Sequence, residues 1–387
     1  MTPELKRAWI ATAIWFGLNA FGLASFIVRL PEVKQILDLS NSRLGLALFL
    51  ASTSVLAAIN LSGKVAAKYG SSPVMFIGGI FTALALPLVS LLTNFPVFVA
   101  SLFILFVALI FMDNAMNAQA VSIEHLSKKL IMGRLHGLFS AGGVAGGFFG
   151  GTCSSLNVSL LAQGITVGLI TLVLVLLFKG FLLPPSADIH EPKEKSAKQK
   201  QPKIFYLLGF VGLCAGIIEG SASDWGAVLI TEEFGASGLI ASMPFIVFQI
   251  AMVIGRFSSD SLTTKFGRAP ILLFCGTFVG LGLSAGLLIG GQIAIVLAWF
   301  AMGIGASVVI PMVFSVAGSL AKNEYSDVVA PSQAVATVSG ISYAAFLFGP
   351  PIIGFAADII SLRWAMLIPA FLALGIVFGS RIAKQVN

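Results

Sequence analysis

The sequence predicts an all-α membrane protein in which twelve transmembrane helices form two parallel six-helix halves. Of its 387 residues, 57% are hydrophobic and only 10% are charged, and the mean hydropathy is +0.99. Soluble domains, by comparison, carry about 25% charged residues. Apolar stretches of roughly 18–25 residues, long enough to cross a bilayer, alternate with short polar loops. This pattern excludes a soluble enzyme, a nucleic-acid-binding protein and a disordered scaffold.

Each predicted element is an apolar run between polar loops. The first run begins at Ala8, continues to Val28 and lacks an Ala-x-Ala cleavage site, so we expect a retained helix rather than a signal peptide. Glycine and proline inside later runs are tolerated, because neighbouring helices in a membrane bundle satisfy the freed backbone groups. The predicted spans are 8–28, 44–62, 73–93, 96–122, 135–156, 158–180, 204–224, 237–255, 270–289, 292–317, 334–357 and 362–380.

The longest polar stretch, Pro184–Lys203, falls between the sixth and seventh spans. It has no apolar periodicity and is expected to be a solvated linker. The predicted organisation is therefore an amino-terminal six-helix bundle (1–183), a cytoplasmic linker (184–203) and a carboxy-terminal six-helix bundle (204–387).

The basic residues predict the orientation. Of the 23 Lys and Arg, 19 fall on the side of the two termini, and the other side holds only Arg29, Lys34, Arg43 and Arg363. Lys and Arg are in excess in cytoplasmic loops. We therefore expect a multi-pass protein of a bacterial cytoplasmic (inner) membrane with both termini in the cytoplasm. The net charge of +7 reflects this loop asymmetry rather than nucleic-acid binding.

The two halves contain a repeated segment. Lys68-Tyr-Gly-Ser-Ser-Pro-Val-Met75 begins the third span, and Lys265-Phe-Gly-Arg-Ala-Pro-Ile-Leu272 begins the ninth span at the matching place in the second half. Six helices per half make the repeat parallel, with a pseudo-twofold axis along the membrane normal. Two parallel halves that rock about a central cavity suit a transporter better than a channel.

The repeated segment also resembles a motif of the major facilitator superfamily, whose loop between spans 2 and 3 reads Gly-x-x-x-Asp-Arg/Lys-x-Gly. Gly63, Lys68 and Gly70 match it, while Ala67 stands at the position of the acid. The second copy keeps Lys265, Gly267 and Arg268, with Asp260 at the position of the first glycine. The resemblance implies that Lys68, Lys265 and Arg268 take part in gating, although the missing acid weakens the usual clamp between loop and helix in the first half.

Four further segments resemble bacterial permeases of the fucose-permease type and their uncharacterised relatives. They are Met112–Glu124, His136–Gly143, Glu219–Trp225 and Gly349–Gly354. The resemblance covers the whole chain and implies secondary active transport, often with proton symport. It does not identify the solute.

A polar stripe crosses the fourth span. Asp113 lies eleven residues before Glu124, about 16 Å deep and close to the membrane midplane. Asp113, Asn117 and Glu124 share one helical face, and Asn114 lies beside it. Since we expect no Lys or Arg in the middle of any span, Asp113 can bind a proton and release it when water access changes sides. The alternative is a permanently protonated structural acid.

Glu219, in the outer half of span 7, is the second candidate for proton coupling or an acceptor for solute hydroxyl groups. Its alternative role is a packing hydrogen bond to a neighbouring helix. Arg29 and Asp224 occupy matching outer ends of spans 1 and 7, and we predict an ion pair that closes an outer gate, with Glu124 as an inner gate residue. Alternatively, Arg29 extends to the interface and Asp224 caps a helix end. If Arg29 faces the cavity, the solute can be anionic.

Several amides and aromatic rings within the spans are candidates for solute binding, since pockets for small solutes combine polar groups with rings. For each aromatic ring, packing against lipid or core is the competing interpretation. The candidates are Trp15, Asn19, Asn114, Asn117, Gln249, Trp299 and Tyr343.

The predicted function is proton-coupled symport of a small polar, sugar-like solute by alternating access in a monomeric permease. A proton-driven exporter of drugs or metabolites and a non-transporting membrane sensor are the alternatives, and sodium coupling stays open. No P-loop and no catalytic triad occurs, so we expect neither an ATP-driven pump nor an enzyme. Cys153, Cys214 and Cys275 have no metal-ligand spacing, and no metal or cofactor is expected.

Overall fold

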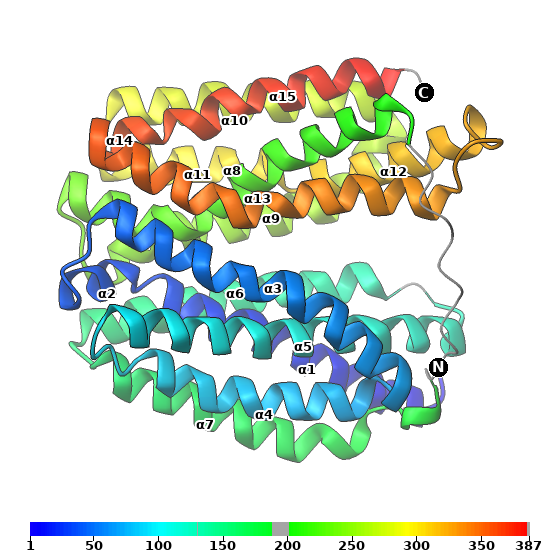
Figure 1. Ribbon diagram of the computed structural model, residues 1–387, viewed down its shortest axis with the longest axis horizontal. Helices are drawn as coiled ribbons and strands as arrows, with labels where there is room; N and C mark the ends of the chain where they lie inside the picture. Colours follow the sequence, from blue (N-terminus) through cyan, green and yellow to red (C-terminus); the bar gives the residue numbers. More distant parts are fainter. Residues whose placement is uncertain (130, 188–200, 385–387) are drawn as a thin grey trace. The chain divides into compact units, whose positions relative to one another are not determined.

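The computed structural model describes residues 1–129, 131–187 and 201–384, which form helices and short connections without any strand (Figure 1). Most of the helices are long, as the spans predict. The helices are α1 (Pro3–Ile27), α2 (Leu30–Ile36), α3 (Asn41–Tyr69), α4 (Ser71–Val89), α5 (Phe95–Ser127), α6 (Met132–Ser155), α7 (Leu160–Phe178), η1 (Lys179–Phe181), η2 (Pro185–Ala187), α8 (Lys203–Phe234), α9 (Gly238–Phe266), α10 (Arg268–Ile289), α11 (Gln292–Ala306), α12 (Val309–Asn323), α13 (Pro331–Ile360), α14 (Leu362–Ala365) and α15 (Leu367–Ala383).

The predicted membrane fold is confirmed. Eleven helical segments among the described residues are long and apolar enough to cross a membrane, and α11 with α12 makes one of them, Gln292–Asn323. The predicted fifth span corresponds to α6, which glycine makes less apolar than the others. Several helices extend past the predicted spans, because a helix continues through the polar residues at its membrane-water boundary. The largest extensions are those of α9, which continues from the predicted end at residue 255 to Phe266, and of α8, which continues from the predicted end at Asp224 to Phe234.

The chain forms two compact units. The first comprises Met1–Leu39, Ala47–Glu194 and Ser237–Ser242, and the second comprises Ser40–Leu46, Lys195–Ala236 and Met243–Asn387. Each unit therefore includes the amino-terminal end of one helix whose remainder belongs to the other unit: α9 begins within the first unit, and α3 begins within the second.

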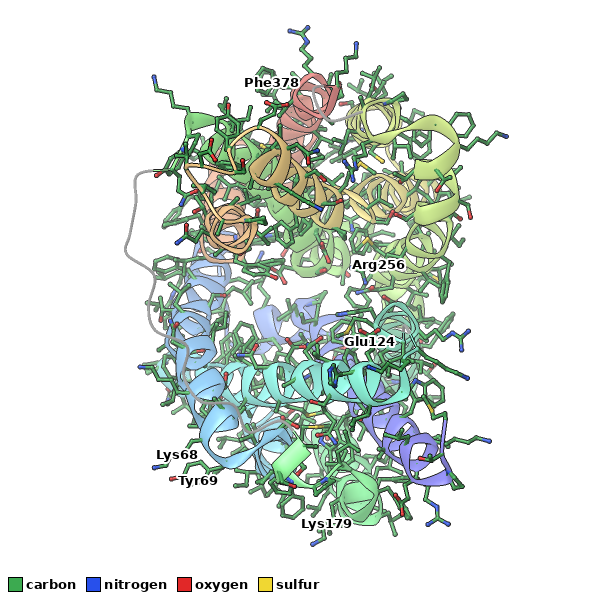
Figure 2. All side chains as sticks on the ribbon, turned by 90° about the vertical axis from the view of Figure 1, so that its right-hand side faces the viewer. Lys68, Tyr69, Glu124, Lys179, Arg256 and Phe378 are labelled. Atoms are coloured by element: carbon green, nitrogen blue, oxygen red, sulfur yellow. The ribbon has the colours of Figure 1, made fainter. Side chains whose placement is uncertain are left out.

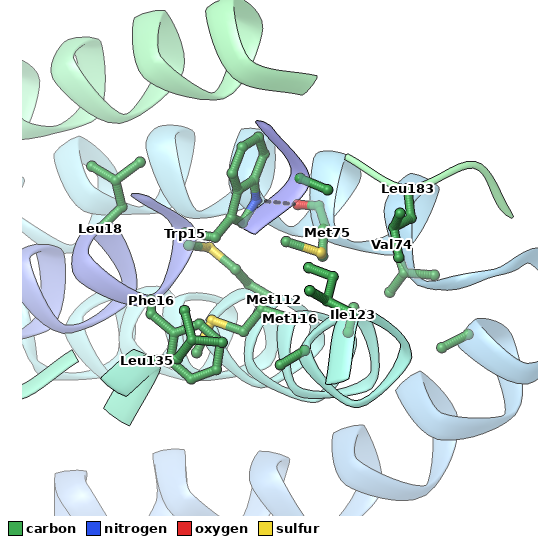
Figure 3. Packing of buried hydrophobic residues seen from close by; sticks show 14 of the residues in the cluster. Trp15, Phe16, Leu18, Val74, Met75, Met112, Met116, Ile123, Leu135 and Leu183 are labelled. Atoms are coloured by element: carbon green, nitrogen blue, oxygen red, sulfur yellow. Dashed lines mark hydrogen bonds between the residues drawn. The ribbon is translucent and has the colours of Figure 1, made fainter. Parts of the chain in front are cut away.

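In the first unit, glycine lets α6 approach α1 closely. A Cβ atom at Gly142, Gly146 or Gly150 would collide with a backbone carbonyl oxygen of α1. These glycines are spaced four apart in the chain and form one face of α6, the arrangement that membrane helices use for close packing. Beside this contact, Trp15 of α1 is fully buried and donates its indole N–H to the carbonyl oxygen of Met75 at 3.1 Å (Figure 3).

In the second unit the small residues lie on the helix that begins the half. A Cβ atom at Gly212 or Gly216 of α8 would collide with Ser342 or Ala345 of α13, respectively. On another side of α8, Trp299 of α11 is fully buried and donates its indole N–H to the carbonyl oxygen of Ala222 at 2.8 Å.

The sequence repeat is also present in the backbone. Gly70 and Gly267 precede α4 and α10, and their φ angles are +84° and +80°. Residues with a Cβ rarely adopt this conformation, so glycine is favoured at both positions. The two turns occupy the same place in the two copies of the repeated segment, and each directs the chain from one membrane helix into the next.

Candidate functional site

Asp113 and Asn117 lie one turn apart near the middle of α5, and both are half-buried. At 1.5 Å per residue, Asp113 lies about 21 Å from the carboxy-terminal end of the helix at Ser127. The Asn117 side chain donates to the backbone carbonyl oxygen of Asp113 at 2.9 Å. Among residues 1–129, 131–187 and 201–384, no hydrogen bond or ion pair is made by the Asp113 carboxylate. It is therefore a half-buried carboxyl group near the middle of a long apolar helix, without a described polar partner.

Asn114 has a different environment from its neighbour Asp113. Its side-chain amide donates to the carbonyl oxygen of Ile59 at 3.2 Å and to the hydroxyl of Ser62 at 2.5 Å, both on α3. The polar residues of α5 therefore lie on two faces. Asn114 ties α5 to α3, and its role in solute binding stays a prediction.

Glu124 caps the following helix. Its carboxylate accepts hydrogen bonds from the backbone N–H groups of Ile131 at 2.6 Å and Met132 at 2.9 Å, where α6 begins. A carboxylate at this position satisfies N–H groups that lack a partner within the helix and complements the helix dipole. This contact gives Glu124 (labelled in Figure 2) a structural role that the sequence did not predict. A role in gating stays a prediction.

Glu219 has a cationic neighbour. Arg256 Nη2 of α9 lies 3.7 Å from Glu219 Oε1 of α8, and both side chains are partly exposed, at 31% and 24% (Figure 2 labels Arg256). The expectation that no Lys or Arg lies in the middle of a span stays a prediction, since Arg256 lies near the end of the membrane-spanning segment Gly238–Ser259. The predicted eighth span ends at residue 255, whereas α9 continues to Phe266, so Arg256 lies about 15 Å from the end of its helix.

Asp224 lies within α8 rather than at its end. The helix continues to Phe234, so the interpretation of Asp224 as a helix cap is wrong. Its side chain is half-buried, and in the part of the chain that the structure describes it makes no hydrogen bond or ion pair.

Arg29 is buried inside the first unit. Only 3% of it is exposed, so it does not extend to a membrane interface. It forms an ion pair with Glu32 and donates to the side-chain carbonyl of Gln163 at 2.9 Å, and Ser154 donates to Glu32 at 2.7 Å. These contacts join the start of α2 to α6 and α7. The predicted ion pair with Asp224, which would join the two units, stays a prediction.

Of the predicted solute-binding rings and amides, three are engaged in packing. Trp15 and Trp299 are fully buried with their indole N–H groups bonded to backbone carbonyls, and packing accounts for both. Asn19, 5% exposed, donates to the carbonyl oxygen of Leu109 at 3.0 Å and ties α1 to α5. By contrast, Gln249 is half-buried and Tyr343 is 47% exposed, with its ring near Phe314 and Phe346.

The residues predicted for the gating loops differ in their contacts. Lys68 and Lys265 are exposed, and each ammonium group lies over the ring of the residue that follows it. The distance to the ring centre is 4.9 Å for Lys68 and Tyr69, which Figure 2 labels, and 5.1 Å for Lys265 and Phe266. Arg268 instead lies at the start of α10 and donates to the hydroxyls of two serines on α12. The two copies of the repeat thus share a backbone turn and the contact of their lysine, whereas Arg268 has a serine, Ser71, at the matching position of the first copy.

The residues that bind to the predicted site residues were not identified from the sequence. Glu32 and Gln163 are the main omissions, although Arg29 and Glu32 have the i, i+3 spacing of a helical ion pair. Within the described ranges, no group of three or more His, Cys, Asp or Glu side chains is placed to hold a metal ion. The three cysteines are free thiols.

The chain is similar to known membrane transporters along its whole length. A family model for the Major Facilitator Superfamily matches residues 12–329 and 208–382. An uncharacterised MFS-type transporter of Yersinia pestis is 31% identical over 375 residues, which cover 96% of this chain and 94% of the relative. The membrane protein MosC of Rhizobium meliloti is 25% identical over 378 residues, covering 97% of this chain and 89% of that protein.

Solved structures agree with the fold. A mutant of the nucleoside transporter NupG superposes with a TM-score of 0.78 at 13% identity, over 97% of this chain and 99% of that one. A bacterial homologue of the human lysosomal transporter Spinster, in an inward-facing and unoccupied conformation, gives a TM-score of 0.73 at 15% identity, over 100% and 99% of the two chains. At these identities the likeness concerns the fold alone.

Proposed function

Because the chain belongs to the major facilitator superfamily, we propose that it is a secondary active transporter that carries a small polar solute together with protons. Transport follows from the family. The symport, the proton as the coupling ion and a sugar-like solute are our proposal. In this account the two units alternate in giving the solute access to either side of the membrane.

The observation that carries the proposal is the environment of Asp113. A carboxyl group near the middle of a membrane helix is energetically costly. Such groups are therefore rare, and they usually mark a solute or ion pathway. Structural acids in such positions are hydrogen-bonded or paired, because an unsatisfied buried charge is expensive. In residues 1–129, 131–187 and 201–384 the Asp113 carboxylate has neither kind of partner, and its side chain is half-buried. It therefore suits a group that gains and loses a proton.

The proposed location is a bacterial inner membrane, with both termini in the cytoplasm. It is supported by the bacterial relatives and by the concentration of Lys and Arg on one side of the chain. In the proposed orientation, the connection from α5 to α6 that Glu124 supports lies on the cytoplasmic side. We propose a monomer, because one chain contains both of the units that alternating access requires.

The two alternative functions, export and sensing, differ from symport in the expected movement of protons and solute. A proton-driven exporter uses the same carboxyl group, but it moves protons inward while the solute leaves. A membrane sensor of the same fold binds its solute without any flux. No feature of the described residues favours either of them over symport.

The test is external pH in a weakly buffered suspension of proteoliposomes without an imposed gradient. Sugars and other small polar solutes are added one at a time to wild-type protein and to Asp113→Asn. We expect alkalinisation with wild-type protein for at least one solute, and none with Asp113→Asn. Acidification would replace symport with exchange. Entry of labelled solute without a pH change in either protein would overturn proton coupling.

A further inference from the structure

The second unit has an open apolar groove of about 920 Å³ between α10 and α11. Small residues bring the two helices together along its floor, since a Cβ atom at Gly282 or Gly286 would collide with a side chain of α11. Larger apolar side chains stand at its rim, and Ile289 and Ile293 are 77% and 79% exposed. The groove is therefore a hollow that the described part of the chain leaves uncovered.

The groove has about the length of one membrane leaflet. Its α10 wall extends from Phe278, at the middle of the helix, to Gly290, the residue that follows the helix end. At 1.5 Å per residue this distance is about 18 Å. The hydrocarbon core of a bilayer is about 30 Å thick, so one leaflet contributes about half of that. The groove thus follows the direction and the reach of an acyl chain from the membrane surface to the midplane.

Arg363 stands at the end of the groove that faces the membrane surface. It belongs to α14, the short helix between α13 and α15 (Figure 1). A Cβ atom at Gly290, which lines the groove, would lie 2.8 Å from Arg363 Nη2. The apolar segment Arg268–Ile289 ends here and the segment Leu362–Ala383 begins here. The guanidinium is therefore at the depth of the lipid headgroups.

The Arg363 guanidinium uses only part of its hydrogen-bonding capacity. Nε donates to the carbonyl oxygen of Leu287 at 2.7 Å, and Nη2 donates to that of Leu288 at 3.1 Å. Both carbonyls lie at the end of α10, where the helix itself supplies no partner. A guanidinium has five N–H donors, so three of them remain, and none has an acceptor among the described residues. The group is held in place and still has donors for a ligand.

No carboxylate of the described residues pairs with this guanidinium. The nearby carboxylate of Glu233 accepts a hydrogen bond of 3.3 Å from the backbone N–H of Arg363 instead. The rings of Phe234 and Trp364 lie 5.5 Å and 5.0 Å from the guanidinium carbon, and tryptophan is enriched at membrane-water interfaces. The positive charge of Arg363 is thus oriented by neutral groups and remains available to an anion.

We propose that the groove binds an anionic phospholipid, whose phosphate group bonds to Arg363 and whose acyl chain lies between α10 and α11. A guanidinium binds phosphate through charge-assisted hydrogen bonds, and a basic group beside an apolar groove is the combination that recognises a lipid headgroup. In the proposed orientation the lipid belongs to the outer leaflet of the inner membrane. This inference depends neither on the solute nor on the coupling ion.

A purely structural Arg363 would behave differently. If it only caps α10, any phospholipid fills the groove equally well, and the charge of the headgroup has no effect. If the guanidinium is a site for free phosphate, a headgroup without acyl chains binds as well as the whole lipid. If the groove receives a second copy of this chain, the protein is a dimer that depends on the groove. Each of these outcomes can be measured.

The experiment measures the midpoint of thermal unfolding of the delipidated protein in a non-ionic detergent against lipid concentration, since binding to the folded state stabilises it. The probes are dioleoyl phosphatidylglycerol, which is anionic, dioleoyl phosphatidylcholine, which has the same chains and no net charge, and glycerol phosphate, which has no chains. We expect phosphatidylglycerol to raise the midpoint at lower concentration than phosphatidylcholine, and glycerol phosphate to have no effect.

Two variants test the two parts of the site. Arg363→Gln removes the charge, so about tenfold more phosphatidylglycerol or higher should be needed for the same rise, as after loss of a charged hydrogen bond. Ala285→Phe places a ring at an exposed position that lines the groove and leaves Arg363 unchanged. It should also weaken the effect of phosphatidylglycerol, and it keeps the test decisive if Arg363→Gln fails to fold.

Each variant has a matched control. Arg381→Gln removes an exposed arginine at the opposite end of α15. Ala100→Phe makes the same substitution as Ala285→Phe at an exposed position of α5, in the first unit. Both controls should respond to phosphatidylglycerol like the wild type.

Several results would overturn the proposal. They are equal stabilisation of the wild type by phosphatidylglycerol and phosphatidylcholine, equal stabilisation by glycerol phosphate alone, and an unchanged response in folded Arg363→Gln or in Ala285→Phe. A dimer in detergent that Ala285→Phe separates, without any difference between the two lipids, would assign the groove to a second copy of the chain instead.

Discussion

The carboxylate of Asp358, near the end of α13, accepts a hydrogen bond of 3.0 Å from the backbone N–H of Asn41, the first residue of α3. Its second oxygen accepts from the backbone N–H of Ser42 at 3.1 Å. Both ends of this contact belong to the second unit, although they lie near opposite ends of the chain. A membrane helix is therefore capped by an acid from a distant helix.

Replacing this cap should destabilise the protein modestly. Asp358→Ala leaves two backbone N–H groups without their acceptor, and the loss of a helix cap costs about 1 kcal/mol. We expect a lower midpoint of thermal unfolding in detergent. Asp327→Ala, which removes an exposed acid from the connection between α12 and α13, is the matched control and should behave like the wild type. Equal stability of Asp358→Ala and the control would show that the cap contributes nothing.

Two substitutions of Glu124 distinguish a role in capping α6 from a role in gating. Glu124→Ala removes the acceptor for the first N–H groups of α6 and should cost about 1–2 kcal/mol of stability. Glu124→Gln keeps an oxygen acceptor at the same place, so it should retain most of the stability. Parallel thermal unfolding and transport assays distinguish the two roles. A Glu124→Gln protein of normal stability that transports poorly would favour gating over capping.

The Arg29 ion pair should be essential for the stability of the first unit. Arg29→Met leaves Glu32 without its cation, and breaking a buried ion pair in this way costs about 3–5 kcal/mol. Adding Glu32→Gln removes the stranded charge and should recover part of the loss in a thermal unfolding assay. If Arg29 and Asp224 form the predicted outer gate, transport rather than stability is affected, and Asp224→Asn should impair transport as strongly as Arg29→Met. Normal transport by Asp224→Asn would leave Arg29 with a structural role alone.

The close packing of α1 and α6 should depend on Gly142. A methyl group there would collide with the carbonyl oxygen of Gly17, so Gly142→Ala must separate the helices and should cost about 1–3 kcal/mol. At Gly63, inside α3, a Cβ would meet no atom within 4 Å, so Gly63→Ala is the matched control and should be neutral or slightly stabilising. Thermal unfolding of both variants in the same detergent provides the comparison. A Gly142→Ala protein as stable as Gly63→Ala would contradict the packing argument.

The membrane fold could be predicted because a bilayer imposes a strong pattern on sequence. Every span must be apolar over about 20 residues, and the turns at Gly70 and Gly267 recur with the same backbone conformation. Asp113 could also be identified as a candidate site residue, since an acidic residue within an apolar segment is recognisable from the sequence alone.

The partners of the polar side chains could not be predicted. Arg256 lies just after the predicted eighth span because the apolar run stops before it, whereas the helix continues and brings it near Glu219. The contact between Asp358 and Asn41 depends on tertiary structure that no local pattern contains. Trp15 and Trp299 were equally consistent with a solute platform or a packed interior, and only their burial favours packing.

The central claim is that Asp113 exchanges a proton with water, and infrared difference spectroscopy of the protein in lipid tests it most directly. Spectra are recorded between acidic and alkaline buffer for wild-type protein, Asp113→Asn and Asp327→Asn. We predict that the wild type shows the carbonyl band of a protonated carboxyl group that disappears on alkalinisation, and that Asp113→Asn lacks this band while Asp327→Asn keeps it. Identical difference spectra for the wild type and Asp113→Asn would contradict the claim, because Asp113 would then hold one protonation state throughout.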